Sequence, residues 1–318
     1  MQKSVRLRSL AKINLDLRVL NKRPDGFHDL RTIFQTISLA DTIDIEFGPG
    51  RTGVDIESNL SIPDNLIVRA ADLVLQVLRK TGRLRFRLRK RIPLGGGLGG
   101  GSSNAAAILL ALPAMLGKSI SLEKMMELAS RLGSDVPFFL LGGTAVGVGR
   151  GTELYPLPDL PNQPSLIVTP GVHVSTAAAY RALNRELTND APSSSINSFQ
   201  AFAWRVEGRA PGEGWRGAND FESAVFSEHP QLKSIKGKLL KLGACPALMS
   251  GSGSTLFGVF RSRELRDRAV ASLKKEAGEG NVHPVSMVSR SRYRALWWRQ
   301  LARYIAPGTW PPQDQSTE

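Results

Sequence analysis

The chain has 318 residues, enough for about two domains, and its 42 Lys and Arg against 28 Asp and Glu give a net charge of +14. This charge favours an anionic partner, and nucleic acid, a phospholipid surface and a phosphorylated metabolite all satisfy that condition. Because Cys245 is the only cysteine and Pro113 interrupts the longest apolar run, residues 105–116, an internal disulfide is excluded and a bilayer-spanning helix is disfavoured, so we expect a soluble cytoplasmic protein.

A strand of alternating polar and apolar residues is predicted first, at residues 11–19. Lys12 and Asn14 fall on one face, and the apolar residues between and after them fall on the other. From the alternation alone, the polar face is best explained as a solvated one. A turn at residues 24–26 then leads to a second strand at residues 30–39.

The next segments lead to a glycine-rich loop. Short strands are predicted at residues 42–47 and 54–57. Asp64 is the candidate cap of the helix that follows, and Asn65 either stabilises that helix start or contacts a ligand. The strand at residues 84–92 alternates apolar residues with arginines, which is typical of a half-exposed antiparallel strand. It ends in a basic run in which Lys90 is a candidate to face an anion, although such runs are more often solvated.

The most informative segment is the loop at residues 93–104, Pro-Leu-Gly-Gly-Gly-Leu-Gly-Gly-Gly-Ser-Ser-Asn. Its glycines leave main-chain N–H groups uncovered, and Ser102, Ser103 or Asn104 can cap a helix through residues 105–112. A helix start adds unpaired N–H groups and the positive end of the helix dipole. The segment therefore predicts a phosphate-binding loop.

Three alternative roles for this loop fit less well. Ser102 stands where a Walker A loop has its lysine. A dinucleotide-binding loop follows a wholly apolar strand, whereas the strand at residues 84–92 alternates with arginines. A flexible linker is not flanked by a strand on one side and an alanine-rich helix on the other.

An exposed aspartate follows the next helix. Ser121 is predicted to cap that helix, which has an apolar face, and Gly133 is predicted to end it. Pro137 marks the start of a further helix, and Asp135 precedes it. From residue type alone, Asp135 is best explained as a helix cap.

Prolines at residues 156–164 follow the strand predicted at 144–149 and mark the predicted domain boundary. A strand begins again at Leu166, and the helix-borne Tyr180 is explained on its own by ordinary packing. We interpret residues 190–217, which are rich in Ser, Pro and Gly and contain one helix candidate, as a variable insertion.

At the C-terminus, residues 290–318 place aromatic and aliphatic residues at helical spacing among several arginines. Such a basic amphipathic helix suits a membrane or partner surface. Docking onto the chain's own domain is the simpler interpretation.

Three motifs occur in the order found in the GHMP small-molecule kinases, which the chain resembles over residues 3 to about 290. They are Lys-x-Asn-Leu at Lys12, the glycine loop, and the strand-turn-strand segment Ser-Gly-Ser-Gly-Ser-Thr at residues 250–255, which alone is weak evidence. The resemblance implies an α+β, two-domain GHMP kinase architecture with the nucleotide in the cleft between the domains. The implied parts are a ribosomal S5 domain 2-like N-terminal domain at 1–155, a ferredoxin-like C-terminal domain at 165–289 and a basic tail at 290–318.

The same resemblance implies roles for individual residues. Asp135 becomes the catalytic base, and Lys12 becomes the cation that keeps it ionised and stabilises developing charge. ATP with Mg²⁺ is the implied cofactor, and the implied ATP-binding residues are Asn65, Lys90, Pro93, Leu94, Gly95, Gly96, Gly97, Leu98, Gly99, Gly100, Gly101, Ser102 and Ser103. Ser102 or Ser103 can offer an oxygen to the metal, but no acidic partner is assignable, so the metal ligands stay unknown.

The segment Arg-Pro-Asp-Gly-Phe-His at residues 23–28 is similar to the substrate loop of one branch of this family. That branch phosphorylates the 2-hydroxyl of a diphosphocytidyl-linked methylerythritol in the non-mevalonate pathway of isoprenoid biosynthesis. It usually has Tyr where this chain has Phe27, which keeps a stacking ring and loses a hydroxyl. In the implied acceptor site, Tyr180 closes over the cytosine opposite Phe27. The predicted acceptor-binding residues are Asn14, Phe27, His28, Thr176, Tyr180, Gly251 and Ser252.

Two alternatives stay open. One is another GHMP kinase, of the mevalonate or homoserine type, whose substrate would not need a base pocket. The other is a basic nucleic-acid-binding protein that uses the tail. The leading prediction is a small-molecule kinase, monomeric or homodimeric, that takes a cytidine diphosphate substrate and no nucleic acid.

Overall fold

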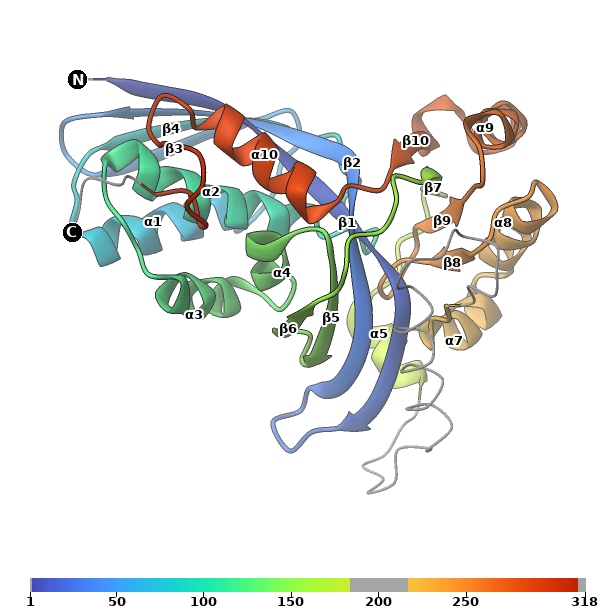
Figure 1. Cartoon of the computed structure of the whole chain (residues 1–318). Coiled ribbons are helices and arrows are strands. Elements are labelled where there is room, and N and C mark those ends of the chain that lie inside the picture. The colour runs from blue at the N-terminus through green and yellow to red at the C-terminus, as the bar shows by residue number, and fades with distance from the viewer. Residues whose placement is uncertain (1, 184–216, 314–318) are drawn as a thin grey trace.

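Two sheets organise the chain, whose computed structural model describes residues 2–183 and 217–313 (Figure 1). The first sheet has six strands in the order β3-β4-β2-β5-β6, with β1 also paired to β2. The second has four antiparallel strands in the order β10-β7-β9-β8. The predicted α+β class is confirmed, and the helix candidate within residues 190–217 falls almost entirely outside the described residues.

The first sheet is built on a long antiparallel hairpin of β1 Lys3–Lys22 and β2 His28–Gly48. β2 continues through both segments that were predicted as separate strands. The remaining strands of this sheet are β3 Gly53–Ser58, β4 Arg83–Arg89, β5 Thr144–Gly149 and β6 Glu153–Pro156. β4 is exposed and buried at alternate residues, as its sequence predicts, and β6 occupies part of the segment that was predicted as a linker.

Helices pack on the first sheet. They are α1 Leu66–Leu78, α2 Gly100–Leu116, α3 Leu122–Leu132 and α4 Val136–Leu141. The predicted cap Ser121 and stop Gly133 of α3 are confirmed. Two other predicted starts are wrong: α1 is capped by Asn65, and α2 begins at Gly100 with no side-chain cap, because Gly99 adopts a left-handed conformation there.

The second sheet carries its own helices. Its strands are β7 Pro164–Val168, β8 Ala247–Met249, β9 Leu256–Val259 and β10 Val282–Ser286. Its helices are α5 Thr176–Ala182, α7 Phe221–Glu228, α8 Pro230–Lys241 and α9 Arg263–Ala277, with a short 3₁₀ turn at Glu279–Asn281.

The middle of β1, a strand of the first sheet, is buried on both faces, because its residues also pack with the second sheet. Leu7 and Leu10 belong to the core under the helices, whereas Ile13 and Leu15 pack with residues of the second sheet. Lys12 and Asn14 are therefore buried too, and the interpretation of their face as solvated is wrong. Alternation could not reveal this burial, because it does not say whether a second layer covers the polar face.

The C-terminal tail docks onto the first sheet's helices through α10 Arg290–Gln300. Tyr293 and Trp297 are buried in that core, and the Tyr293 hydroxyl donates to the carbonyl of Phe139 in α4. A Cβ at Gly142 would lie 2.2 Å from Tyr293 Cδ1, so the end of α4 approaches the tail too closely for a side chain there. In the structure the tail thus docks onto the chain's own N-terminal domain, which is the simpler of the two interpretations from sequence. No helix in the two described ranges has the length and apolarity to cross a bilayer.

Candidate active site

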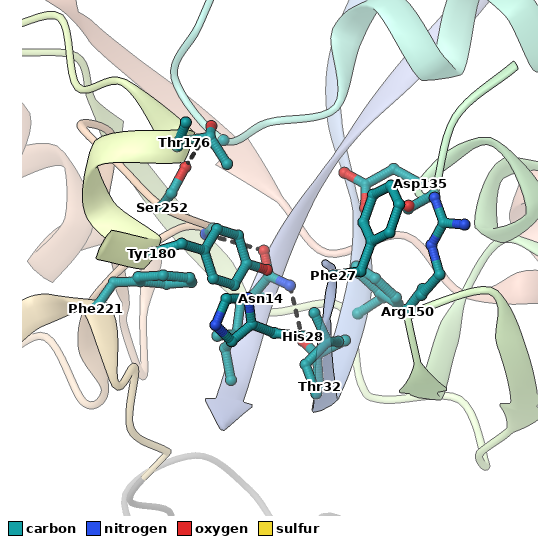
Figure 2. Close-up of a pocket in the computed structure, with 18 of the residues that line it drawn as sticks. Asn14, Phe27, His28, Thr32, Asp135, Arg150, Thr176, Tyr180, Phe221 and Ser252 are labelled. Carbon is teal, nitrogen blue, oxygen red and sulfur yellow. Dashed lines mark hydrogen bonds between the residues drawn. The ribbon is translucent and has the colours of Figure 1, made fainter. Parts of the chain in front are cut away.

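A cleft of about 1120 Å³ receives residues from both sheets (Figure 2). β1 supplies Lys12 and Asn14, the β1–β2 turn supplies Phe27 and His28, and the residue before α4 is Asp135. The other side of the cleft comes from the second sheet's elements. It comprises Thr176, Ala177, Tyr180, Arg181, Phe221, Gly251 and Ser252. A volume of this order accommodates a nucleotide-sized ligand.

Lys12 and Asp135, predicted to act together, are adjacent in the cleft. Lys12 Nζ lies 3.2 Å from Asp135 Oδ2, and the side chains are 4% and 32% exposed. Asp135 stands at the cap position of α4 but makes no side-chain capping bond. Its carboxylate is therefore directed to Lys12 and the cleft, and the role of a helix cap does not describe it.

Asn14 fixes the position of Lys12. Its Oδ1 accepts from Lys12 Nζ at 2.8 Å and from the main-chain N–H of Gly251 at 3.0 Å, which uses both lone pairs of the oxygen. Its Nδ2 donates to Thr32 Oγ1 at 2.7 Å. The amide oxygen of Asn14 thus links Lys12 to the turn at residues 250–255, and because Asn14 also lines the cleft, its contact with the acceptor stays a prediction.

Several main-chain N–H groups of the glycine loop are available to a ligand. Within the described ranges, the N–H groups of residues 95–99 bond to no protein acceptor. Two carbonyls of the loop do have partners: that of Leu98 accepts from Lys12 N at 3.0 Å, and that of Gly97 accepts from Ser250 Oγ at 2.9 Å. The loop is thus held by its carbonyls and leaves its N–H groups for an anion.

Close contact with the turn at residues 250–255 explains two of the glycines. A Cβ at Gly97, where φ is +74°, would lie 2.1 Å from the Ser250 carbonyl oxygen. A Cβ at Gly96 would lie 2.3 Å from Thr255 Oγ1. The loop therefore packs directly on the turn at residues 250–255, which brings two of the predicted motifs together.

Three predicted ATP-binding residues are used elsewhere by the protein. Lys90 is buried and ion-paired with Asp41, and burial lowers its pKa although Asp41 opposes that effect. Asn65 accepts from Ile67 N as the cap of α1, at 3.0 Å. Each side chain thus has a partner within the protein: the strand end at Lys90 turns inward, and the amide oxygen of Asn65 completes a helix start. Their contact with ATP stays a prediction.

The third is Ser103. Its hydroxyl donates to the Leu10 carbonyl at 2.6 Å, so it is not available to a metal in this arrangement. Ser102 is partly exposed beside the turn that leads to Asp135, since a Cβ at Gly133 would lie 4.0 Å from its Oγ. Ser102 is therefore the better candidate of the two.

Aromatic rings form the far end of the cleft. The His28 and Tyr180 rings stack with centroids 4.6 Å apart, and Tyr180 meets Phe221 edge-on at 4.8 Å. Phe27 is 48% exposed and pairs instead with Arg150, whose guanidinium carbon lies 3.5 Å from the ring centre. The His28 ring lies over Tyr180 in the structure, and a cytosine held between Phe27 and Tyr180 stays a prediction.

Burial and nearby charges shift the pKa values of two residues at this end of the cleft. Burial, reinforced by the charge of Asp135, raises the pKa of Tyr180 to about 12, so its hydroxyl stays protonated at neutral pH. Burial and the charge of Lys22 lower the pKa of His28 below its ordinary value, so its ring is neutral. A neutral imidazole has one donor and one acceptor nitrogen.

The remaining predicted acceptor residues line the opposite wall. Thr176 Oγ1 and Ser252 Oγ lie 2.9 Å apart, which ties α5 to the turn at residues 250–255 (Figure 2). Gly251 lines the cleft beside them. Asn219, just before α7, holds this turn by donating to the carbonyls of Met249 and Gly251 at 2.7 and 2.8 Å.

Two residues that matter were missed from sequence. Asp41 lies inside a long strand, where nothing marks a buried carboxylate, yet it accepts from Lys90 and from the main-chain N–H groups of residues 91 and 92. Arg150 stands between Gly149 and Gly151 directly after a strand, and that tight-turn signature could have singled it out.

A resident metal cluster is not part of the described residues: no group of three or more His, Cys, Asp or Glu there could hold an ion. Magnesium in phosphoryl-transfer sites is bound largely by substrate phosphates and waters, with few protein oxygens. A partly exposed Ser102 beside the glycine loop, with the Asp135 carboxylate in the same cleft, fits that requirement.

Comparison with known proteins bears on the whole chain. The family model "GHMP kinases N terminal domain" matches residues 65–143, and "GHMP kinases C terminal" matches residues 208–280. The 4-diphosphocytidyl-2-C-methyl-D-erythritol kinase of Solibacter usitatus is 53% identical over 314 residues, which is 97% of this chain and 96% of the relative. The enzyme of that name from Thermus thermophilus is 40% identical over 265 residues, 83% of this chain and 90% of the relative.

Solved structures agree with these relatives. The crystal structure of a 4-(cytidine 5'-diphospho)-2C-methyl-D-erythritol kinase matches with a TM-score of 0.71 at 37% identity, covering 90% of this chain and 99% of that one. A homoserine kinase from Cytophaga hutchinsonii matches with a TM-score of 0.68 at 21% identity, covering 90% and 95%. The second likeness shows the fold alone.

Proposed function

The chain belongs to the 4-diphosphocytidyl-2-C-methyl-D-erythritol kinases, within the GHMP kinase family, and from that premise we propose the following reaction. The enzyme transfers the γ-phosphoryl group of ATP to the 2-hydroxyl of 4-diphosphocytidyl-2-C-methyl-D-erythritol, in the non-mevalonate pathway of isoprenoid biosynthesis. The products are the 2-phosphate and ADP. We assign the reaction to the cytoplasm, as the sequence analysis expects.

One observation carries the assignment of the reacting centre. The Lys12–Asp135 pair, at 3.2 Å, shares a cleft with the glycine loop and with the aromatic end of the cleft. A kinase needs a phosphate cradle, a residue that accepts the hydroxyl proton, and an acceptor site, all within reach of one another.

The free N–H groups of residues 95–99 bind the ATP phosphates in this proposal. Asp135 accepts the proton as the acceptor oxygen forms its bond to the γ-phosphorus and the bond to the ADP oxygen breaks. Lys12 stabilises the negative charge that develops on the transferred group. When bound with ATP, Mg²⁺ supplies further neutralisation of phosphate charge, and Ser102 is the residue we assign to hold it.

The acceptor's cytosine contacts Phe27 and His28, and Tyr180 with Phe221 supports the His28 ring from behind. Stacking tolerates any base, so selection of cytosine requires hydrogen bonds to its edge. The neutral His28 ring, with one donor and one acceptor, can supply them.

We propose residues 1–155 and 165–289 as the two domains that contribute to the cleft. Strands β6 and β7 belong to different sheets and are separated only by residues 157–163, which supports a boundary there. The tail from residue 290 packs with the N-terminal domain.

An ATP-coupled assay with the authentic diphosphocytidyl alcohol tests the proposal. We expect turnover with that acceptor and a much poorer rate with its uridine analogue, which reverses donor and acceptor at two edge positions. Mevalonate and homoserine serve as competing acceptors in the same assay. Phosphorylation of either of them in preference to the cytidine compound, or equal rates with the uridine analogue, would contradict the proposal.

A further inference from the structure

Arg150 reaches the acceptor end of the cleft from a rigid turn. It lies between β5 and β6, flanked by Gly149 at φ +64° and Gly151 at φ +87°. The N–H of Gly151 donates to the Val148 carbonyl at 3.0 Å, which closes the turn. Both glycines adopt conformations that side chains disfavour, so the direction of Arg150 is set by the backbone.

The guanidinium covers one face of Phe27. Its central carbon lies 3.5 Å from the ring centre, a close cation–π stack. Figure 2 shows Arg150 beside Phe27, on the side away from Tyr180 and His28. Arg150 therefore supports the Phe27 ring from behind and leaves its other face to the cleft.

Within the described ranges Arg150 forms no ion pair, although its charge interacts at longer range with Asp25. Its Nε is buried with no hydrogen-bond partner. The nearby Asp25 and Asp29 are both paired with Arg23, at 3.1 and 2.8 Å. A buried donor of a charged group without a partner is costly, and a ligand that accepts from it removes the cost.

The cleft as a whole is basic at this end. Among the described residues that line it, Lys12, Lys22, Arg150 and Arg181 are cationic, whereas Asp135 is the one carboxylate, and Lys12 pairs with it. Three cations thus surround the acceptor end without a lining carboxylate beside them. An uncharged acceptor would gain nothing from this arrangement.

Resting on the proposed function, we propose that Arg150 is a specificity-determining residue that binds the diphosphate of the acceptor while it supports Phe27 against the cytosine. A planar guanidinium can stack on a ring through its face and donate to phosphate oxygens through its edge. One side chain therefore reads the base and the phosphates together. It distinguishes a nucleoside diphosphate ester from a nucleoside of the same base.

Binding of cytidine and of cytidine diphosphate, measured by calorimetry with the ATP site saturated with ADP, tests this inference. Arg150→Met should weaken binding of the diphosphate by about 10- to 100-fold, the scale of a charge-assisted hydrogen bond, and weaken cytidine at least tenfold less. Arg150→Lys keeps the charge without the planar fork and should fall between wild type and Arg150→Met. If Arg150→Met does not fold, the affinities of Arg150→Lys test the inference instead.

Arg23→Met is the matched control, because this arginine lies in the β1–β2 turn that carries Phe27 but is already paired with Asp25 and Asp29 and does not line the cleft. It should leave both affinities unchanged. Equal losses for cytidine and its diphosphate in Arg150→Met, or an equal loss in Arg23→Met, would overturn the phosphate contact. Wild-type protein that binds cytidine diphosphate but fails to phosphorylate the full acceptor would instead refute the proposed function.

Discussion

The two ends of the cleft are built in different ways. At the glycine loop, main-chain atoms pack on main-chain atoms: Gly97 lies against the Ser250 carbonyl, and Leu98 is bonded to the backbone of Lys12. At the acceptor end, the contacts are between side chains, with His28 stacked on Tyr180 and Phe27 on Arg150. The proposed phosphate-binding loop is therefore held by backbone contacts, whereas the proposed acceptor end is formed by side chains.

The Lys12–Asp135 pair, proposed as the reacting centre, gives the largest expected effect. Asp135→Asn should lower kcat by roughly 100-fold or more, the scale of general-base loss, with Michaelis constants for both substrates nearly unchanged. Steady-state kinetics measure both quantities. Near-normal turnover of Asp135→Asn would show that Asp135 has only a structural role.

The double variant sharpens this result. Lys12→Ala should also impair turnover, and combined with Asp135→Asn it should cost less than the sum of the two losses in activation free energy, since the residues lie 3.2 Å apart and act as a unit. Additive losses would argue that they do not share one proton-transfer site.

Gly97→Ala attacks the contact that holds the loop. The new Cβ would lie 2.1 Å from the Ser250 carbonyl oxygen, at a φ of +74° that alanine disfavours. We expect a loss of at least about 2 kcal/mol in the free energy of unfolding, measured by denaturant titration. Gly101→Ala is the control, because the nearest atom to its Cβ is 3.7 Å away and α2 already includes this residue. A similar loss in both variants would mean that loop flexibility, not the close contact, is what the glycines provide.

Phe27→Ala tests the side-chain end. Base–aromatic stacking contributes about 1 to 3 kcal/mol, so the Michaelis constant for the cytidine substrate should rise roughly tenfold while that for ATP stays nearly constant. Phe27→Tyr should change little, because the ring does the stacking and the half-exposed edge can place a hydroxyl in water. An effect of Phe27→Ala on ATP alone would move the base site elsewhere.

The smallest expected effect is a pH dependence of stability at His28. Its pKa is lowered in the folded protein by burial and by Lys22, so the unfolded chain binds the proton more readily. Stability from this residue is complete above its ordinary pKa of 6.5 and is lost as pH falls below it.

His28→Phe keeps a ring against Tyr180 and cannot titrate, so its free energy of unfolding should fall less than that of wild type between pH 7.5 and about 5.5. His283, whose pKa is also lowered by burial and then by Arg91, supplies the part that both proteins retain. The same pH dependence of the free energy of unfolding in both proteins would show that His28 does not contribute to it.

Prediction from sequence succeeded where a motif determines its own local structure. The glycine loop before a helix, the capped α3 and the turn at residues 250–255 all carry local signals, and the structure contains each of them. The family resemblance brought Lys12 and Asp135 together, although they lie more than 100 residues apart in sequence. Residue type alone favoured a solvated lysine and a helix cap.

Local pattern misjudges an environment that long-range packing decides. The face of Lys12 and Asn14 was predicted to be solvated and is buried. Lys90 and Asn65 have partners within the protein, Asp41 and the start of α1, that local pattern cannot identify. Only the fold shows that the His28 ring stacks on Tyr180. Sites formed by side chains are thus harder to predict from sequence than sites formed by main-chain atoms.

The docked tail has a consequence for how the protein is made. Tyr293 and Trp297 complete the core over α4, and the Tyr304 hydroxyl pairs with the backbone of Ser4, so the first strand and the last helix close the same structure. At roughly 5 to 20 residues per second, about 7 to 28 s separate synthesis of residue 156 from that of Trp297. During that interval the core over α4 lacks two of its aromatic side chains, Tyr293 and Trp297. We therefore expect the packing of the N-terminal domain to be completed only after the tail has been made.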